Sequence, residues 1–182
     1  KKYFSENQIL VNVSKGIENN SLMTVSDIII DELGCSYEKI VTLSGPSHAE
    51  EGIKLNPTTL VSSSKDLVSA KKIQSLFSST FLRIYINRDI LGVELGGAIK
   101  NVIAIASGIC DGIGYGDNTK AALLTRGISE IGNLGNLMGA KSSTFQGLSG
   151  IGDLIVTALS QHSRNRLVGQ EIGKGKSLNS IL

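Results

Sequence analysis

The chain has 182 residues, of which 41% are hydrophobic, and a formal net charge of +2 at pH 7. This length suffices for one or two compact domains with buried cores, and the near-neutral charge gives no reason to expect a nucleic-acid partner. Cys35 and Cys110 lie far apart, and with His48 and His162 they form no spacing typical of a metal site or a disulfide framework. No apolar run reaches the roughly 18 residues of a membrane span, and the first residues show no apolar leader. We expect a cytoplasmic protein with no metal, no membrane span and no nucleic-acid partner.

Residues 1–88 alternate strand-like runs with helical segments. Apolar β-type runs predict strands at residues 9–14, 39–45, 58–64 and 81–87. Helical spacing predicts a helix at 21–34 that stops at Gly34, a short helix or loop at 47–55, and an amphipathic helix at 64–79. The apolar positions of the last helix are Leu67, Val68, Ile73, Leu76 and Phe77. Strands and helices in alternation predict a parallel α/β sheet.

Beyond Arg88 the strand signal ends and helical runs follow. They cover residues 89–114, residues 118–140 and, after a loop, the end of 143–161. Asp117 or Asn118 is the expected N-cap of the second run. The predicted division is an α/β domain at residues 1–88 and an all-helical domain at residues 89–182. Glycine costs about 1 kcal/mol against alanine inside a helix, so the glycines of the helical part indicate close helix packing or room for a small ligand.

Lys100 stands in the middle of an apolar helical stretch. Its neighbours on the helix are small or apolar, namely Gly96, Gly97, Ile103, Ala104 and, further along, Ser107. This face leaves space around the amine, and a buried lysine loses its proton more easily because desolvation disfavours the charge. Lys100 is therefore a candidate proton donor or acceptor near neutral pH. The alternative is a lysine that extends along its own stem to the surface.

Two stretches of the helical part carry polar residues suited to ligand binding. The glycine-rich stretch 147–157 leads into a helix with Asp153 near its start and Thr157 four residues later on the same face. A ligand role for Asp153 competes with that of an acid that complements the helix dipole. The stretch HSRNR, residues 162–166, contains arginine, whose planar fork of donors suits phosphate. The alternative for this stretch is a solvated loop.

Two further candidates follow predicted strands. Lys15 ends the first strand, where ligands gather in parallel sheets, unless it is an ordinary exposed lysine. In LSGPSHAEE, residues 43–51, Ser47 and Glu50 fit a capping box, S-x-x-E. The free amides at the start of that helix also suit an anion. No G-x-G-x-x-G motif follows a predicted strand.

Together these motifs resemble the NAD(P)-dependent glycerol-3-phosphate dehydrogenase family of the bacterial type. The matching stretches are VSKGIE, LSGPSHAEE, GVELGGAIKNVIAIASGICDGIG, GDNTKAALLTRG, TFQGLSGIGDLIVT and HSRNR, in the family's order. The resemblance implies the second part of a Rossmann-type parallel sheet, followed by a helical domain like that of 6-phosphogluconate dehydrogenase. It also implies an oxidoreductase that interconverts dihydroxyacetone phosphate and sn-glycerol 3-phosphate with NAD or NADP and feeds glycerophospholipid synthesis.

The resemblance assigns roles to individual residues. Lys100 is the implied catalytic proton donor and acceptor. The implied contacts of the small phosphorylated substrate are Lys15, Gly45, Ser47, Lys100, Asp153, Thr157, Ser163, Arg164 and Asn165, the last three at its phosphate. The implied contacts of the cofactor are Ala49 and Arg164. The resemblance leaves a homodimer and the choice between NAD and NADP open.

The family starts with a glycine-rich turn and the first βαβ units of a Rossmann domain, which this sequence lacks. Its last helices are cut short after GKGKSLNSIL. We expect a fragment without the N-terminal Rossmann start and the C-terminal end, with little or no turnover by itself. One alternative is a related two-domain hydroxyacid dehydrogenase, against which the phosphate-type cluster HSRNR argues. Another is an inactive fragment that acts as an interaction module, against which the retained Lys100, Asp153 and Arg164 argue.

Overall fold

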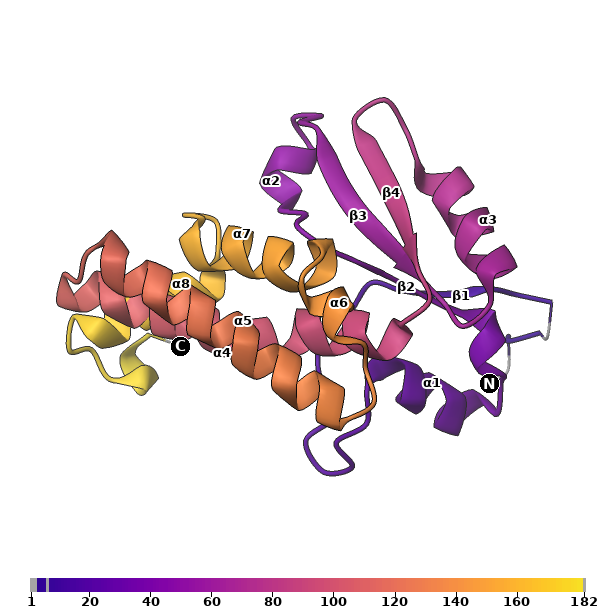
Figure 1. Ribbon diagram of the computed structural model, residues 1–182, viewed down its shortest axis with the longest axis horizontal. Helices are drawn as coiled ribbons and strands as arrows, with labels where there is room; N and C mark the ends of the chain where they lie inside the picture. Colours follow the sequence, from indigo (N-terminus) through magenta and orange to yellow (C-terminus); the bar gives the residue numbers. More distant parts are fainter. Residues whose placement is uncertain (1–2, 6, 182) are drawn as a thin grey trace.

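A computed structural model of the chain describes residues 3–5 and 7–181, with a sheet-containing part and a helical part (Figure 1). The strands are β1 (Leu10–Asn12), β2 (Ile40–Ser44), β3 (Thr58–Ser63) and β4 (Leu82–Asn87). The helices among them are α1 (Val25–Leu33), α2 (Ala49–Gly52) and α3 (Leu67–Phe77). The helical part contains α4 (Ile90–Ile113), α5 (Asp117–Leu137), α6 (Ser142–Phe145), α7 (Asp153–Leu159) and α8 (Arg164–Gly173). The expected fold class, an α/β part followed by helices, is confirmed.

The sheet has the order β1-β2-β3-β4, but it is not parallel throughout. β1 pairs with β2 and β3 pairs with β4 in parallel, whereas β2 and β3 are antiparallel. The prediction of a parallel sheet is therefore wrong at the central pair. The connection between β2 and β3 carries only the four-residue helix α2, so the chain turns back at the same edge instead of crossing over the sheet.

This topology decides where α4 begins and where Lys100 lies. β4 runs opposite to β2, so α4 starts at the edge remote from the carboxyl ends of β1 and β2. Lys100 lies ten residues after the start of α4, which is about 15 Å along a helix axis. A strand of five residues such as β2 has a length of about 17 Å. Helix α4 thus returns beside the sheet and brings Lys100 to the edge where β1 and β2 end.

Each part has its own hydrophobic core. The sheet packs against α3 through Val41, Leu43, Ile73 and Ile84. The helices enclose a second cluster of Leu95, Ile131, Ala140 and Phe145. The amphipathic helix α3 lies within the predicted range 64–79 but is shorter. Its predicted apolar face is wrong, because Val68 and Leu76 are 74% and 72% exposed. The buried side of α3 carries the small residues Ser69 and Ala70 beside Ile73, which bring the helix close to the sheet.

The long helices α4 and α8 pack closely through glycine. A Cβ atom at Gly108 or Gly112 would overlap the carbonyl oxygen of Arg166 or Gln170 on α8. On the other side, Gly169 and Gly173 lie against carbonyl oxygens of α4 in the same way. Backbones can approach this closely only where side chains are absent. The close helix packing that the glycines indicated is confirmed here.

Two predicted helix caps differ in the structure, and one agrees. Helix α1 ends at Gly34 with a left-handed φ of 68°, as predicted. The N-cap of α5 is Gly116, so Asp117 lies in the first turn instead of capping it. His48 is the N-cap of α2 and makes no side-chain cap bond. The predicted capping box of Ser47 and Glu50 is therefore wrong, since the Ser47 hydroxyl donates to the Gly45 carbonyl oxygen at 3.3 Å instead.

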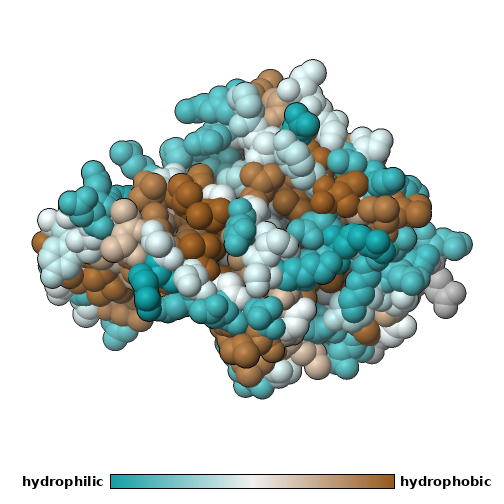
Figure 2. Space-filling model, in the orientation of Figure 1, coloured by the Kyte–Doolittle hydropathy of each residue, from teal (hydrophilic) through white to brown (hydrophobic). Residues whose placement is uncertain are grey.

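Helix α4 is long and apolar enough to cross a membrane by length and composition alone, with a mean hydropathy of 1.5. The expectation that no run reaches this length is therefore wrong. Of its most apolar window, 56% is buried within the protein, as is usual for a core helix. Figure 2 shows hydrophobic side chains over the helical part and over the sheet on the face in view, with hydrophilic ones between them.

Candidate active site

The candidate site lies where the carboxyl ends of β1 and β2 meet α4 and α7. Lys15 follows β1, Gly45 follows β2, and Lys100 and Asp153 come from the two helices. The structure brings five of the predicted residues together around one small cavity of about 80 Å³. They are Lys15, Ser47, Lys100, Asp153 and Thr157, with His48 and Val156 completing the lining.

Asp153 is the centre of this cluster. Its Oδ1 accepts a hydrogen bond from the Lys100 Nζ, and its Oδ2 accepts one from the Lys15 Nζ at 2.6 Å. The Lys100 Nζ also donates to the Thr157 hydroxyl at 2.6 Å, and that hydroxyl donates to the Asp153 carbonyl oxygen. Lys100 and Asp153 are buried, at 5% and 1% exposure. The carboxylate thus orients two ammonium groups, and the hydroxyl fixes a second direction of the Lys100 amine.

Burial has the largest effect on the acid–base properties of Lys100. It lowers the pKa of this amine, the Asp153 carboxylate opposes the change, and the nearby Lys15 ammonium adds to it; the resulting pKa is about 8. A group with this pKa exchanges its proton near neutral pH, as a general acid or base must. Lys100 is only 5% exposed, so the alternative of a lysine that extends along its own stem to the surface is wrong.

The space expected beside Lys100 is largely filled by the chain itself. A Cβ atom at Gly97 would lie 3.3 Å from the Cγ and Cδ atoms of Lys15, and one at Gly96 would lie 2.6 Å from the Ser149 carbonyl oxygen. Ser107 donates to the Ala158 carbonyl oxygen of α7 at 2.9 Å. The small face of α4 therefore serves to bring the Lys15 stem and the turn before α7 close to Lys100.

A π-helical turn at Leu148–Gly152 leads directly into α7 and places Asp153. Within it, a Cβ atom at Gly150 would overlap the backbone of Phe145, which is itself buried in the helical core. The glycine-rich sequence before Asp153 thus lets this turn pack against α6. As a result Asp153 lies at the first position of α7 and points at both lysines.

Gly45 needs the conformational freedom of glycine. Its φ is 143°, and an added Cβ would lie 3.2 Å from the Thr59 carbonyl oxygen, so any other residue would be strained there. Its carbonyl oxygen accepts a hydrogen bond from Lys15 at 3.4 Å. Ala49 lies at the start of α2, outside the residues that line the small cavity.

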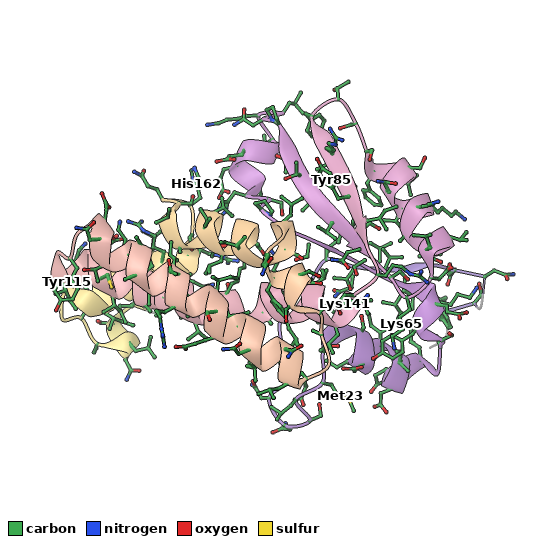
Figure 3. The ribbon with its side chains drawn as sticks, in the orientation of Figure 1. Met23, Lys65, Tyr85, Tyr115, Lys141 and His162 are labelled. Carbon is green, nitrogen blue, oxygen red and sulfur yellow. The ribbon has the colours of Figure 1, made fainter. Side chains whose placement is uncertain are left out.

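The predicted phosphate residues form the start of α8. Ser163 is buried and caps this helix, since its hydroxyl oxygen accepts from the Arg166 amide at 3.2 Å. Arg164 is exposed and Asn165 is half-buried. None of the three lines the cavity around Lys100. His162, just before them, lies with its ring 6.1 Å from that of His48, beside α2 (Figure 3).

Sequence reasoning overlooked three side chains at or near the site. The sequence patterns assign no role to His48 and His162, although their rings join the loop before α2 to the start of α8. Glu94 was passed over, although it is a buried carboxylate on α4, bonded to Asn12, Thr42 and Ser26. The signal for Glu94 was available, because an acid within so apolar a helix needs buried partners. The identity of these partners could not be predicted from the sequence, because they lie on three other elements.

Among the described residues, no group of three or more histidine, cysteine, aspartate or glutamate side chains is arranged to hold a metal ion. Both cysteines are free thiols.

Comparison with known proteins relates this geometry to a family. The family model for the NAD-dependent glycerol-3-phosphate dehydrogenase C-terminus matches residues 89–182, and the model for the N-terminus of the same enzymes matches residues 1–70. The chain belongs to the NAD-dependent glycerol-3-phosphate dehydrogenase family. A glycerol-3-phosphate dehydrogenase [NAD(P)+] from Pelotomaculum thermopropionicum is 55% identical over 99% of this chain and 52% of its own length. The enzyme of the same name from Bacillus velezensis is 54% identical over 99% of this chain and 52% of its own length.

Solved structures of glycerol-3-phosphate dehydrogenases have the same fold. The enzyme from Coxiella burnetii superposes with a TM-score of 0.90 at 36% identity, covering 95% of this chain and 52% of that one. The Plasmodium falciparum enzyme gives a TM-score of 0.83 at 26% identity, over 94% of this chain and 48% of that one. The chain thus spans about half the length of the glycerol-3-phosphate dehydrogenases that it matches.

Proposed function

We propose that this protein catalyses the interconversion of dihydroxyacetone phosphate and sn-glycerol 3-phosphate with NAD or NADP, and so supplies glycerophospholipid synthesis. The observation that carries the proposal is the buried Lys100 amine, held by Asp153 and Thr157 beside the second ammonium of Lys15. A carbonyl reduction needs a proton donor at the carbonyl oxygen, and this amine has a pKa of about 8. Its family membership supplies the substrate.

In this proposal Lys100 acts as the proton donor for reduction. The substrate carbonyl oxygen takes up the proton from the Lys100 Nζ as the C–O π electrons move onto the oxygen. The carbonyl carbon would become that of a secondary alcohol with the hydride that a bound nicotinamide would supply. The amine is left neutral, and the reverse reaction returns the proton to it. Asp153 orients the ammonium through the bond to its Oδ1. Lys15 places a second positive charge beside the oxygen where negative charge develops.

We assign the substrate phosphate to the start of α8. Arg164 is exposed there and offers the guanidinium fork that matches phosphate oxygens. Asn165 adds an amide donor. The Ser163 oxygen accepts the Arg166 amide proton, which leaves the hydroxyl hydrogen able to donate to the phosphate. The helix N-terminus adds its own preference for an anion.

We assign Ala49 and Arg164 to the part of a nicotinamide dinucleotide site that this chain carries. Among the described residues, Arg164 makes no ion pair, and Ala49 leaves little side-chain bulk at the start of α2. The His48 and His162 rings bring these two neighbourhoods together, so that one ligand could reach both. When bound, the cofactor supplies hydride to the carbonyl carbon or accepts it in the reverse reaction.

The remaining parts of the proposal concern organisation. We assign residues 1–88 to the cofactor domain and residues 89–182 to the substrate and catalytic domain, because the sheet ends at Asn87 and helices follow from Ile90. The free state of both cysteines supports a reducing, cytoplasmic setting. Assembly into a homodimer stays a prediction that sedimentation analysis would test.

The comparisons do not favour the two alternative functions. A dehydrogenase for another hydroxyacid would need no phosphate contacts at the start of α8, and the relatives cited above carry the name glycerol-3-phosphate dehydrogenase. An interaction module without activity would have no use for a buried lysine and aspartate pair around a cavity. An assay that compares the turnover of dihydroxyacetone phosphate with that of a non-phosphorylated keto acid distinguishes the first alternative from the proposal.

The test is a turnover assay on the 182-residue chain and on the chain joined to the flanking segments of the Bacillus velezensis relative. NADH and NADPH oxidation is followed with dihydroxyacetone phosphate, and Lys100→Ala is measured beside the parent. We expect turnover from the joined chain, little from the 182 residues alone, and a loss of about 100-fold or more in Lys100→Ala. Turnover of another keto substrate, with none of dihydroxyacetone phosphate, would contradict the substrate assignment.

A further inference from the structure

Glu94 is a buried carboxylate that ties α4 to three other elements. Its Oε1 accepts hydrogen bonds from Asn12 of β1 at 2.9 Å, from Thr42 of β2 at 2.9 Å and from Ser26 of α1 at 2.7 Å. Glu94, Asn12, Thr42 and Ser26 are all buried. All three donors are neutral, and no described lysine or arginine forms an ion pair with Glu94. A buried carboxylate is expensive unless its bonds are satisfied, so this network holds β1, β2 and α1 in one arrangement around α4.

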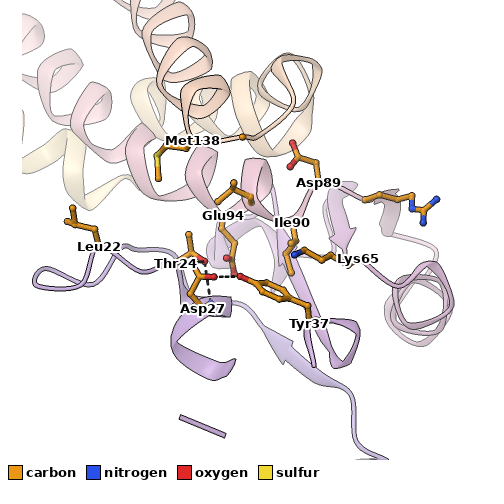
Figure 4. Close-up of a pocket in the computed structure, with 12 residues that line it drawn as sticks. Leu22, Thr24, Asp27, Tyr37, Lys65, Asp89, Ile90, Glu94 and Met138 are labelled. Carbon is orange, nitrogen blue, oxygen red and sulfur yellow. Dashed lines mark hydrogen bonds between the residues drawn. The ribbon is translucent and has the colours of Figure 1, made fainter. Parts of the chain in front are cut away.

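Glu94 also borders a pocket of about 420 Å³ (Figure 4). On that side lie Asp27 and Tyr37, but these two bond to each other, and Thr24 bonds to Asp27 as its helix cap. They therefore do not compete for the Glu94 oxygens. Two of the Glu94 partners lie on strands and one on α1, and the bond to Asn12 of β1 leads toward the candidate active site.

Asn12 connects Glu94 to the turn that carries Lys15. Its Nδ2 donates to Glu94, and its Oδ1 accepts the backbone amide proton of Ser14 at 2.8 Å. Lys15 is the next residue. Its stem then crosses α4 at Gly97, one turn after Glu94, where an added Cβ would lie 3.3 Å from it. The turn thus contacts α4 at two positions one helical turn apart, Glu94 and Gly97. Beyond them, the Lys15 ammonium donates to Asp153.

We propose that Glu94, acting through Asn12, is a positioning residue that fixes the Lys15 turn and keeps the Lys15 ammonium on Asp153 beside Lys100. The consequence for catalysis rests on the proposed function, but the positioning itself does not. If the turn is released, Asp153 loses one ammonium partner and turns fully to Lys100. Lys100 then loses a like-charged neighbour and gains a larger share of its carboxylate.

The sign of the effect separates this proposal from simple electrostatics. Loss of the Lys15 ammonium from the site raises the proton affinity of Lys100, because a like charge is removed. Loss of the negative charge of Glu94 by itself would act in the opposite direction. The other titratable groups that share the cavity with Lys100 in the described chain are Asp153 and His48, and the test leaves both in place.

The test is an NMR titration of the Lys100 side chain in the 182-residue protein labelled with ¹³C-lysine. Asn12→Ala removes both bonds of the relay without a change of charge, and we expect the Lys100 midpoint to rise by about 0.5 to 1 pH unit. Ser26→Ala is the matched control, since it removes a neutral donor to the same Glu94 oxygen from α1. It should move the midpoint by less than about 0.2 unit.

An unchanged Lys100 midpoint in a folded Asn12→Ala, or an equal rise in Ser26→Ala, would overturn the proposal, because a merely structural role treats both donors alike. If Asn12→Ala does not fold, Glu94→Met serves instead, since it keeps about the same side-chain length but removes the oxygen that accepts the Asn12 bond. It should raise the midpoint, whereas a decrease would indicate the direct charge effect alone. The titration needs no substrate, so absence of turnover in the parent would count against the proposed function and leave this result standing.

Discussion

Helix α4 contributes to two clusters in which one carboxylate lies between two cations. The Asp153 cluster consists of Asp153, Lys15 and Lys100, and the Asp111 cluster consists of Asp111, Lys120 and Arg166. In the second cluster Asp111 Oδ1 lies 2.9 Å from the Lys120 Nζ, and Oδ2 lies 2.6 Å from the Arg166 Nη2. Both clusters have the same arrangement of charges, yet the pKa values of their lysines shift in opposite directions.

The pKa of Lys120 is raised, chiefly by its hydrogen bond to Asp111, whereas burial lowers the pKa of Lys100 to about 8. The Lys120 side chain keeps 18% exposure and the Lys100 side chain 6%. An ion pair stabilises the ammonium in both clusters, but desolvation outweighs it only at Lys100. The comparison teaches that burial, and not the presence of a partner, distinguishes a lysine suited to proton transfer from one that joins helices.

The largest expected difference between the clusters is in turnover. Asp153→Asn removes the charge that orients both lysines, and we expect kcat of the joined chain to fall about 100-fold or more. Asp111→Asn, assayed in parallel, should keep kcat within about threefold of the parent, because no residue of the Asp111 cluster lines the cavity. Comparable losses in the two variants would contradict the division of roles.

The second effect concerns the helix contact that supports the Asp111 cluster. Gly108→Ala places a methyl group on the Arg166 carbonyl oxygen, and we expect a loss of about 1 to 3 kcal/mol in the free energy of unfolding. Gly132→Ala on α5 is the control, since its Cβ would meet only the Phe145 Cβ at 3.9 Å. It should stabilise the chain by about 0.5 to 1 kcal/mol. Urea unfolding measures both, and a neutral Gly108→Ala would show that α4 and α8 can separate freely.

The third effect is the pH dependence of the proposed reaction. Reduction requires the protonated Lys100 amine, so kcat should fall by about tenfold per pH unit above the Lys100 pKa of about 8. Oxidation of glycerol 3-phosphate requires the neutral amine and should rise through the same range. Lys120→Met should leave both profiles in place. Profiles measured in both directions that bend at the same pH would support Lys100 as the titrating group, and a reduction rate that stays flat to pH 10 would exclude it.

The smallest effect is the contribution of the Asp111 cluster to stability. Burial alone would raise the pKa of Asp111, but Lys120 and Arg166 hold it below its usual value. A carboxyl with a lowered pKa stabilises the folded state at neutral pH, and this contribution is lost as the pH falls below about 4. Asp111→Asn should therefore cost about 1 kcal/mol at pH 7 and less at pH 3. Thermal unfolding at the two pH values measures the difference.

Local patterns explain why much of the fold was predictable. The strand runs, the helix stop at Gly34 and the long helix around Lys100 follow from short-range spacing and backbone preference. The predicted parallel sheet failed at β2 and β3, because the direction of a connection depends on how the chain packs and not on the residues within it. The predicted burial of Val68 and Leu76 is wrong for a related reason, since the element that packs against α3 decides which side of the helix is covered.

The sequence by itself determined the elements, their order and the set of polar residues available for chemistry, because these depend on neighbours within a few positions. The convergence of Lys15, Lys100 and Asp153 required the tertiary structure, as these residues are separated by 138 positions at most. The pKa of Lys100 required it too, since desolvation is a property of the whole packed environment. The same holds for Glu94, whose charge is visible in the chain but whose three partners are brought to it only by folding.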